Sequence, residues 1–467
     1  MRGIISYGAY VPPHRLKREA IEAALRTKIG SGTRSVASYD QDTTTLGVEA
    51  ARLALDQTGE AVARLLFATA SPAYLDKTNA TALHAALELG PSVLALDSGG
   101  ALRSGLGSLL TALQGGPTSL VVLSDMRGGR PGSDEESAGG DAAAAFVVGD
   151  GKNVLAEFCG SGSITDEFMD RWRLPGEKTA QVWEERFGET VYAGLVEKAL
   201  SNTLDDLGLA HADLARIVVT GVHGRAVKAA QRRLGSTVVS DLTEAIGQTG
   251  AAHSGVLLTV ALAGAKPGDR IAVVSLADGV DVAVFKATSA IERYWPQRPL
   301  ASQLNGQIFD VDYPTFLGWR GFLDRQPPRR PDLVRPAAPP SFRNRGWKFG
   351  LAGSEDRSSH AVHLPPQRVS FVGEAVDDMT SAPRADAYGT IATFSIDRLA
   401  YTPSPPMIVA VIDFDAGGRF IAELTDAKPD EVAIGMRVEM TFRRFYTAGG
   451  IHNYFWKARP VRVDEER

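Results

Sequence analysis

Apolar residues fall into two patterns that alternate along the first 290 residues of the chain. Short continuous runs, such as RLLFATA at 64–70 and RIVVTGV at 216–222, predict buried strands. Between them, segments with apolar residues at helical spacing, such as TTTLGVEAARLAL at 43–55, predict helices. The alternation predicts an α/β architecture in which helices pack on a sheet. Because the order of elements in residues 166–290 resembles the order in residues 1–165, we also predict an internal duplication.

A proline-rich segment and a change of pattern mark the rest of the chain. Residues 291–341 begin with helical patterns and end in RQPPRRPDLVRPAAPPS, whose prolines exclude a helix interior or a central strand. We interpret this segment as a surface linker rather than as a proline-motif ligand. From residue 384 onward the pattern becomes strand-rich, with a DAGG hairpin turn between two apolar strands. About five strands in so short a segment predict a small closed β-barrel of the OB type.

The bulk composition excludes several classes of function. A chain of 467 residues has room for about two or three domains, and 44% hydrophobic with 22% charged residues is typical of a globular protein. The net charge of −5 provides no basic surface for nucleic acid, and no apolar run is long enough for a membrane span. The N-terminus reads as a strand and a proline turn rather than a signal peptide, so we expect a cytoplasmic protein. The single cysteine, Cys159, excludes a disulfide framework and a cysteine-based metal site.

Several motifs, taken in order, carry a family resemblance. The stretches TRSVASYDQDTTTLGVEAARLAL, SAGGDAAAAFVVGD, VVTGVHGRAVKAA and IGQTGAAHSGVLL resemble the 3-hydroxy-3-methylglutaryl-CoA synthase branch of the thiolase superfamily. The C-terminal part, with FRNRGWKFGLAGSEDRSSHAVHL and YGTIATFSIDRLAYTPSPPMIVAVIDFD, resembles the zinc-ribbon and OB-fold proteins that partner thiolase-like enzymes. The resemblance implies an acyl-CoA thioester as substrate, no bound cofactor, and a homodimer or a hetero-oligomer with a thiolase-like paralogue.

The same resemblance implies a division of the chain into five parts. A duplicated thiolase fold would comprise an N-terminal half at 1–165 and a C-terminal half at 166–290. A helical and proline-rich linker at 291–341 would lead to a degenerate zinc-ribbon lobe at 342–383 and an OB-fold domain at 384–467.

The turn ALDSGGALRSGLGSLLTAL at 95–113 departs from the family pattern. In the family, a cysteine on this turn attacks the thioester as a thiolate and holds the acyl group. The matching position here is Leu102, which cannot form an acyl-enzyme. Ser98 and Ser104 lie nearby, but a serine nucleophile needs an adjacent base, and both suit a turn or a helix cap.

Other family positions give the candidate site residues. The family histidine matches His223, which would hydrogen-bond the thioester carbonyl or move a proton; a structural histidine is the alternative. The family asparagine matches Gln248, which keeps an amide on a longer side chain, and the acidic base matches Ala70.

Further polar groups are expected near the pocket. With Leu102, we assign Asp97, Arg103 and His253 to substrate binding, although structural roles suit them as well. Basic residues in RWRLPGEK at 171–178 are candidates for the CoA phosphates or a solvated face.

Loss of the nucleophile leaves open a chemistry that needs no acyl-enzyme. Aldol or retro-aldol cleavage of a β-hydroxyacyl-CoA requires a base for the hydroxyl and a donor for the thioester enolate. His223 would contact the enolate, and Tyr74 or Asp76 would act as base or acid. One alternative is a non-catalytic scaffold or binding subunit for an active paralogue. Another is a conventional synthase, which Leu102 disfavours.

The zinc-ribbon lobe also departs from its family. The four thiolate positions read Asp356, Ser359, Ser370 and Gly373, with His360 and His363 close by. Because these do not make a tetrahedral structural site, we expect no zinc, and we expect the lobe to be held by packing.

Overall fold

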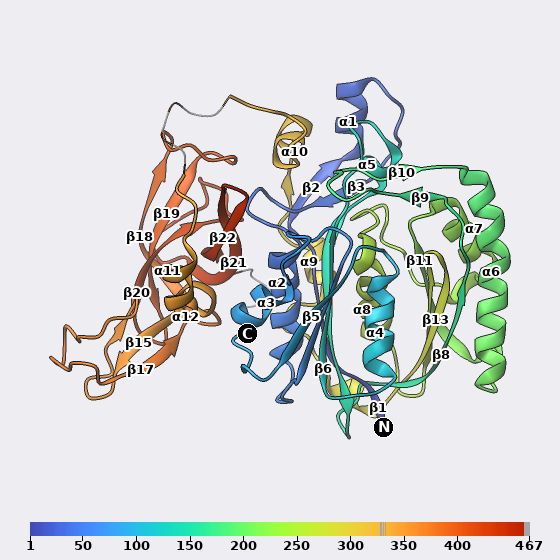
Figure 1. Ribbon diagram of the computed structural model, residues 1–467, viewed down its shortest axis with the longest axis horizontal. Helices are drawn as coiled ribbons and strands as arrows, with labels where there is room; N and C mark the ends of the chain where they lie inside the picture. The colour runs from blue at the N-terminus through green and yellow to red at the C-terminus, as the bar shows by residue number, and fades with distance from the viewer. Residues whose placement is uncertain (327–328, 330, 332, 462–467) are drawn as a thin grey trace.

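The computed structural model describes residues 1–461 except 327, 328, 330 and 332, and these residues form a nine-stranded sheet, a small barrel and the helices that cover them (Figure 1). The sheet order is β11-β12-β13-β8-β1-β7-β6-β4-β5. Its strands are β1 (Arg2–Tyr10), β4 (Arg64–Thr69), β5 (Leu94–Gly99), β6 (Ser119–Met126), β7 (Asp141–Asp150), β8 (Ala156–Thr165), β11 (Leu214–Gly221), β12 (Arg270–Leu276) and β13 (Gly279–Ala287).

The two halves of the sheet repeat one topology. In the first half β1 pairs antiparallel with β7, β7 antiparallel with β6, and β6 parallel with β4. In the second half β8, β13, β12 and β11 follow in the same order with the same directions. The halves join where β1 pairs with β8. The predicted α/β fold with a duplicated order of elements is confirmed.

Three layers of helices pack on the sheet because their apolar residues face it. The apolar α8 (His253–Ala263) and α4 (Ser104–Leu113) share a buried core with strands of both halves. On other faces, α2 (Thr43–Leu55) packs against β1 and β7, and α6 (Glu185–Asp206) with α7 (Gly224–Leu234) covers the second half (Figure 1).

The remaining elements of the body are short. They are a sheet of β14 (Phe309–Asp310), β2 (His14–Lys17) and β3 (Thr33–Val36), a pair of β9 (Arg171–Trp172) and β10 (Gln181–Val182), and helices α1 (Arg18–Leu25), α3 (Ala80–Ala86), α5 (Asp134–Ala138), α9 (Leu300–Asn305) and α10 (Tyr313–Trp319).

Within the described residues, five C-terminal strands close into a barrel, as the sequence pattern predicts. The order is β18-β19-β20-β22-β21, from β18 (Tyr388–Asp397), β19 (Met407–Phe414), β20 (Arg419–Leu424), β21 (Arg437–Ala448) and β22 (Ile451–Pro460). Buried and partly exposed residues alternate along β19, so one face of the strand fills the barrel. The DAGG turn joins β19 to β20, and its Gly417 and Gly418 take φ values of 82° and 94° that favour glycine.

A small lobe connects the barrel to the body. It contains α11 (Ala338–Arg343), α12 (Arg345–Gly350) and a sheet in the order β16-β15-β17, from β15 (Ala352–Asp356), β16 (Val362–His363) and β17 (Met379–Pro383). Helix α12 contacts both α3 of the body and β22 of the barrel.

A cluster of largely buried charges joins the barrel to the body, and we call it the interdomain ion cluster. Its members are Asp40, Glu49, Glu439, Arg443, Lys457 and Arg459. Glu49 on α2 pairs with Arg459 at 2.7 Å, and Arg459 also pairs with Glu439 at 2.6 Å. Asp40, which precedes α2, pairs with Lys457 at 3.1 Å. The carboxylates of the body therefore neutralise cations of β21 and β22.

Among the described residues, no helix has the length and apolarity that crossing a membrane requires.

The interdomain ion cluster should make stability depend on acidity. Burial alone would raise the pKa of Glu439, but Arg459 and Arg298 outweigh it and lower the pKa to about 2. Because an unfolded glutamate titrates near about 4.3, the ionised group stabilises the fold above that pH, and this stabilisation is lost as the pH falls toward the folded value. Between about pH 6 and about pH 3, we expect the wild type to lose about 2 kcal/mol more unfolding free energy than Glu439→Gln.

Urea unfolding across this pH range measures the difference. Glu439→Gln should also be several kcal/mol less stable near neutrality, because Arg459 loses a buried partner. The matched control is Asp430→Asn at an exposed carboxylate, which should keep the wild-type pH dependence. The prediction would be contradicted if the unfolding free energies of the wild type and Glu439→Gln changed equally with pH.

Candidate functional site

A cavity of about 490 Å³ lies beside α5 and the first turn of α7, and we call it the α5–α7 cavity. Residues 171–185 and the turn around Gln248 complete its walls. Charged side chains of both signs line it, among them Glu135, Arg171 and Lys228. The cavity therefore joins residues of both sequence halves around a polar interior.

Glu135 is one of the four acidic residues that line this cavity. One oxygen, Oε1, pairs with Arg171 and lies 3.4 Å from Arg127. The other oxygen, Oε2, is buried and has no hydrogen-bond partner. An unpartnered buried oxygen carries a desolvation penalty that a proton or a donor from a ligand would remove.

Two arginines, Arg127 and Arg171, lie against the Glu135 carboxylate. Burial lowers the pKa of Arg171 to about 10, and the charge of Arg127 contributes to this decrease. At neutral pH the Arg171 guanidinium keeps its charge, so it can orient Glu135 or contact an anionic ligand.

Gln248 presents an amide donor to the same cavity. Its turn is fixed by backbone pairing, because Gln248 N donates to Ala138 O at 2.7 Å and Gly140 N donates to Gln248 O at 2.9 Å. The side-chain Oε1 accepts from Gly250 N at 2.7 Å, which orients the amide. Within the described part of the chain, no atom accepts a hydrogen bond from Nε2, which is therefore available as a donor.

His223 caps a helix in this structure. It lies between β11 and α7, is 6% exposed, and its Nδ1 accepts from Ala226 N at 3.2 Å. With Nδ1 as acceptor, Nε2 donates to Glu185 O at 2.8 Å. Both ring nitrogens are therefore bound to backbone, and a contact with substrate would require the Glu185 bond to open.

Three polar residues predicted near the pocket also contact protein. Arg103 forms two hydrogen bonds of 2.8 Å with Asp281, and Asp97 accepts from the backbone of α3 at 2.7 Å. His253 is buried at the start of α8, accepts from Thr249 N at 3.2 Å, and has its pKa lowered to about 4 by burial. These contacts are structural ones, and the assignment of the three residues to substrate binding stays a prediction.

Tyr74 and Asp76 lie away from Gln248, in the loop between β4 and α3. The Tyr74 hydroxyl accepts from His452 N of the barrel at 2.7 Å, and Asp76 is exposed. Neither lines the α5–α7 cavity. The structure thus brings Gln248 together with Glu135, and not with the two residues that the sequence offered as base.

Leu102 is half-buried in the turn between β5 and α4. The only cysteine does not replace the missing thiol, because Cys159 lies in β8 and burial raises the pKa of its thiol. Arg173, from the basic segment, donates to the carbonyl of Ala70. Arg171, which belongs to the same basic segment, lines the α5–α7 cavity.

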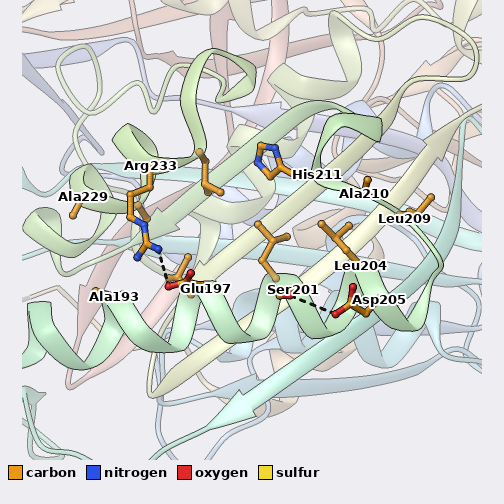
Figure 2. A pocket seen from close by; sticks show the side chains of 14 residues that line it. Ala193, Glu197, Ser201, Leu204, Asp205, Leu209, Ala210, His211, Ala229 and Arg233 are labelled. Carbon is orange, nitrogen blue, oxygen red and sulfur yellow. Dashed lines mark hydrogen bonds and ion pairs between the residues drawn. The ribbon is translucent and has the colours of Figure 1, made fainter.

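A separate apolar cavity of about 390 Å³ lies between α6 and α7 (Figure 2). Its rim carries an ion pair of 2.7 Å between Glu197 and Arg233 and a hydrogen bond of 3.5 Å between Ser201 and Asp205 (Figure 2). None of the site residues predicted from the sequence lines it.

Curated relatives match about two thirds of the chain. A hydroxymethylglutaryl-CoA synthase of Methanopyrus kandleri is 30% identical over 325 residues, which cover 64% of this chain and 92% of that protein. The hydroxymethylglutaryl-CoA synthase of Pyrococcus furiosus is 30% identical over 322 residues, covering 66% and 91%. The chain belongs to the hydroxymethylglutaryl-CoA synthase family. Residues 384–443 match the family described as the ChsH2 C-terminal OB-fold domain.

Solved structures show the same fold at lower identity. MvaS in complex with 3-hydroxy-3-methylglutaryl coenzyme A superposes with a TM-score of 0.56 at 20% identity, covering 72% of this chain and 94% of that one. The curacin-pathway HMG synthase in complex with holo donor-ACP gives a TM-score of 0.59 at 17% identity, covering 68% and 88%. The predicted duplicated thiolase-type fold followed by an OB-fold barrel is confirmed.

The positions that the resemblance assigns to zinc thiolates lie together in the lobe. The Asp356 carboxylate accepts from the hydroxyl of Ser359 at 2.7 Å and from that of Ser358 at 2.8 Å. Hydrogen bonds from Ser359, Ser370 and Ser358 hold its pKa well below the usual range. A Cβ built at Gly373 would lie 2.3 Å from the same carboxylate.

The two histidines of the lobe do not complete a metal site. His360 pairs with Glu355 at 2.9 Å on the surface, whereas His363 is buried and packs edge-on against Phe371. Across the described residues, no group of three or more His, Cys, Asp or Glu side chains is arranged to hold a metal ion. The residues present therefore do not fit a zinc site.

The cap at α7 predicts the effect of removing His223. His223→Ala leaves Ala226 N and Glu185 O without their partners, so we expect unfolding free energy to fall by about 1–3 kcal/mol. His211→Ala, at an exposed histidine, should stay within about 0.5 kcal/mol of the wild type. Urea unfolding measures the stability of both variants. If His223→Ala and His211→Ala are equally stable, His223 has no structural role.

The lobe predicts insensitivity to metal removal. Because the oxygens of Asp356, Ser359 and Ser370 already hydrogen-bond one another, we expect no stoichiometric zinc in the purified protein. Elemental analysis and thermal unfolding with and without a chelator test this. About one zinc per chain, or a clear fall in Tm on chelation, would contradict it.

Proposed function

We propose that this chain binds an acyl-CoA thioester in the α5–α7 cavity and makes or breaks a carbon–carbon bond without an acyl-enzyme. The observation that carries the proposal is that Glu135 and Gln248 line one cavity, and that Glu135 Oε2 and Gln248 Nε2 both lack a partner within the described chain. The ligand class follows from the relatives, which are named as synthases of hydroxymethylglutaryl-CoA. Leu102 supports the noncovalent route, since its side chain has no atom that can attack a thioester.

In the cleavage direction, Glu135 acts as the base. Its Oε2 takes the proton of the β-hydroxyl, the bond between the α- and β-carbons breaks, and the β-carbon becomes a carbonyl. The electron pair of that bond passes into the thioester, whose enolate oxygen is stabilised by Gln248 Nε2. Protonation of the α-carbon by the glutamic acid then releases a shorter acyl-CoA and restores the carboxylate.

Other residues would bind and support the substrate rather than react. Lys228 and Arg18 line the cavity and supply positive charge for the CoA phosphates. His223 holds the first turn of α7 that forms a wall. We assign the proton transfer to Glu135 in place of Tyr74 and Asp76, because those two do not line this cavity.

A second candidate function is a binding subunit that partners a catalytic thiolase-like chain. The observation that favours it is the engagement of both His223 ring nitrogens by backbone, which leaves the family histidine without a free nitrogen. A binding subunit would keep the affinity for acyl-CoA and lack turnover.

Titration of the purified chain with a panel of β-hydroxyacyl-CoAs, followed by product analysis, separates the two candidates. We expect binding with turnover, and a loss of at least about 100-fold in kcat for Glu135→Gln at nearly unchanged Kd. Gln248→Ala should lower kcat by about 10-fold to 1,000-fold through the lost enolate contact.

The matched control is Glu19→Gln, at an exposed glutamate, which should leave both binding and turnover unchanged. Binding without turnover in the wild type would replace the enzyme by the binding subunit. Absence of binding to every thioester would reject both functions.

A further inference from the structure

A cavity of about 820 Å³ lies between the body and the C-terminal domains, and we call it the interdomain cavity. The β4–α3 loop and α3 form one wall, and α11, α12 and β22 form the others. In Figure 1, α11 and α12 lie at the left and α7 at the right, with the central sheet between them. The interdomain cavity shares no lining residue with the α5–α7 cavity.

Four cationic side chains line the interdomain cavity, and no acidic side chain does. The cations are Lys77, Arg335, Arg345 and Lys348. In the described part of the chain, none of the four has a carboxylate within ion-pairing distance. Lys348 is half-buried and the other three are exposed, so together they give the cavity a positively charged lining that an anion can reach.

The two lysines have only neutral hydrogen-bond partners. Lys77 Nζ donates to Thr81 Oγ1 at 2.7 Å, and Lys348 Nζ donates to Asn453 Oδ1 at 2.6 Å. Burial lowers the pKa of both lysines, although Asp97 partly offsets the effect at Lys77. A bound anion would favour their charged forms and supply the missing counter-charge.

Aromatic and aliphatic side chains form the rest of the surface. Phe342, Phe349 and Tyr454 line the cavity, and the Arg345 guanidinium lies 5.1 Å above the Phe342 ring. Such walls accept a flat or apolar group, while the cations accept a phosphate. The volume lies within the usual range of about 300–1,000 Å³ for small-molecule sites.

We propose that the interdomain cavity binds a phosphate-bearing organic anion with a flat or apolar portion, of about the size of a nucleoside diphosphate. Both a free nucleotide and the nucleotide end of a CoA thioester carry these two groups, the phosphates and the flat base. The proposal does not depend on turnover in the α5–α7 cavity, because binding at the interdomain cavity is measured by itself.

Calorimetric titration with ADP at low salt tests the proposal. We expect saturable binding that weakens as salt increases, and an increase in Kd of about tenfold or more in both Lys77→Gln and Arg345→Gln. Adenosine, which lacks the phosphates, should bind much more weakly than ADP. Lys152→Gln removes the same charge at an exposed turn and should bind ADP like the wild type.

Thermal unfolding of each variant confirms that it is folded before its affinity is compared. Competition then identifies the source of the anion: displacement of ADP by an acyl-CoA indicates the substrate's own nucleotide, and simultaneous binding indicates a separate ligand. The proposal is overturned if ADP does not bind, if adenosine binds equally well, or if neither Lys77→Gln nor Arg345→Gln alters the affinity.

Discussion

The arrangement of the molecule depends on the buried ion pairs between α2 and the last two barrel strands. Glu49 and Asp40 are fixed by the body, and their cationic partners Arg459 and Lys457 are fixed by β22. Each charge has lost most of its water, so it is tolerated only while its partner is in place. This requirement sets the position of the barrel on the body more strictly than apolar contact alone, which is less directional.

That fixed docking determines what the neighbouring loop can do. The loop after β4 contacts the barrel through the Tyr74 hydroxyl and His452 N, and the ring of Tyr74 packs on His452. The loop therefore forms a wall of the interdomain cavity and does not line the α5–α7 cavity. The barrel thus forms part of the surroundings of Tyr74, which the sequence alone associates with the pocket.

The alternation of strands and helices, the duplication and the barrel could be predicted from the sequence, because each depends on local periodicity. The place of Leu102 in a turn between a strand and a helix could also be predicted, because glycines in that turn separate the two periodic segments. The surroundings of Glu135 could not, because the sequence shows an acid in GSDEESAGG but not that one of its oxygens is buried without a partner. Nor could it show that the carbonyl of Glu185, 38 residues earlier, would bind the second ring nitrogen of His223.

The glycine-rich turns shared with the family are explained by packing, whether or not the chain is an enzyme. A Cβ at Gly105 would lie 2.0 Å from Ala251 O, and one at Gly140 would lie 1.9 Å from Ile246 O. Each contact brings a turn of the first half against a turn of the second, so a larger residue would separate the halves. Retention of these turns therefore follows from the fold and does not distinguish a catalyst from a binding subunit. Among the described residues, three buried carboxylate oxygens lack a partner, on Glu135, Glu136 and Asp426. Of these three residues only Glu135 lines the α5–α7 cavity, and the proposed catalysis depends on that position rather than on the shared turns.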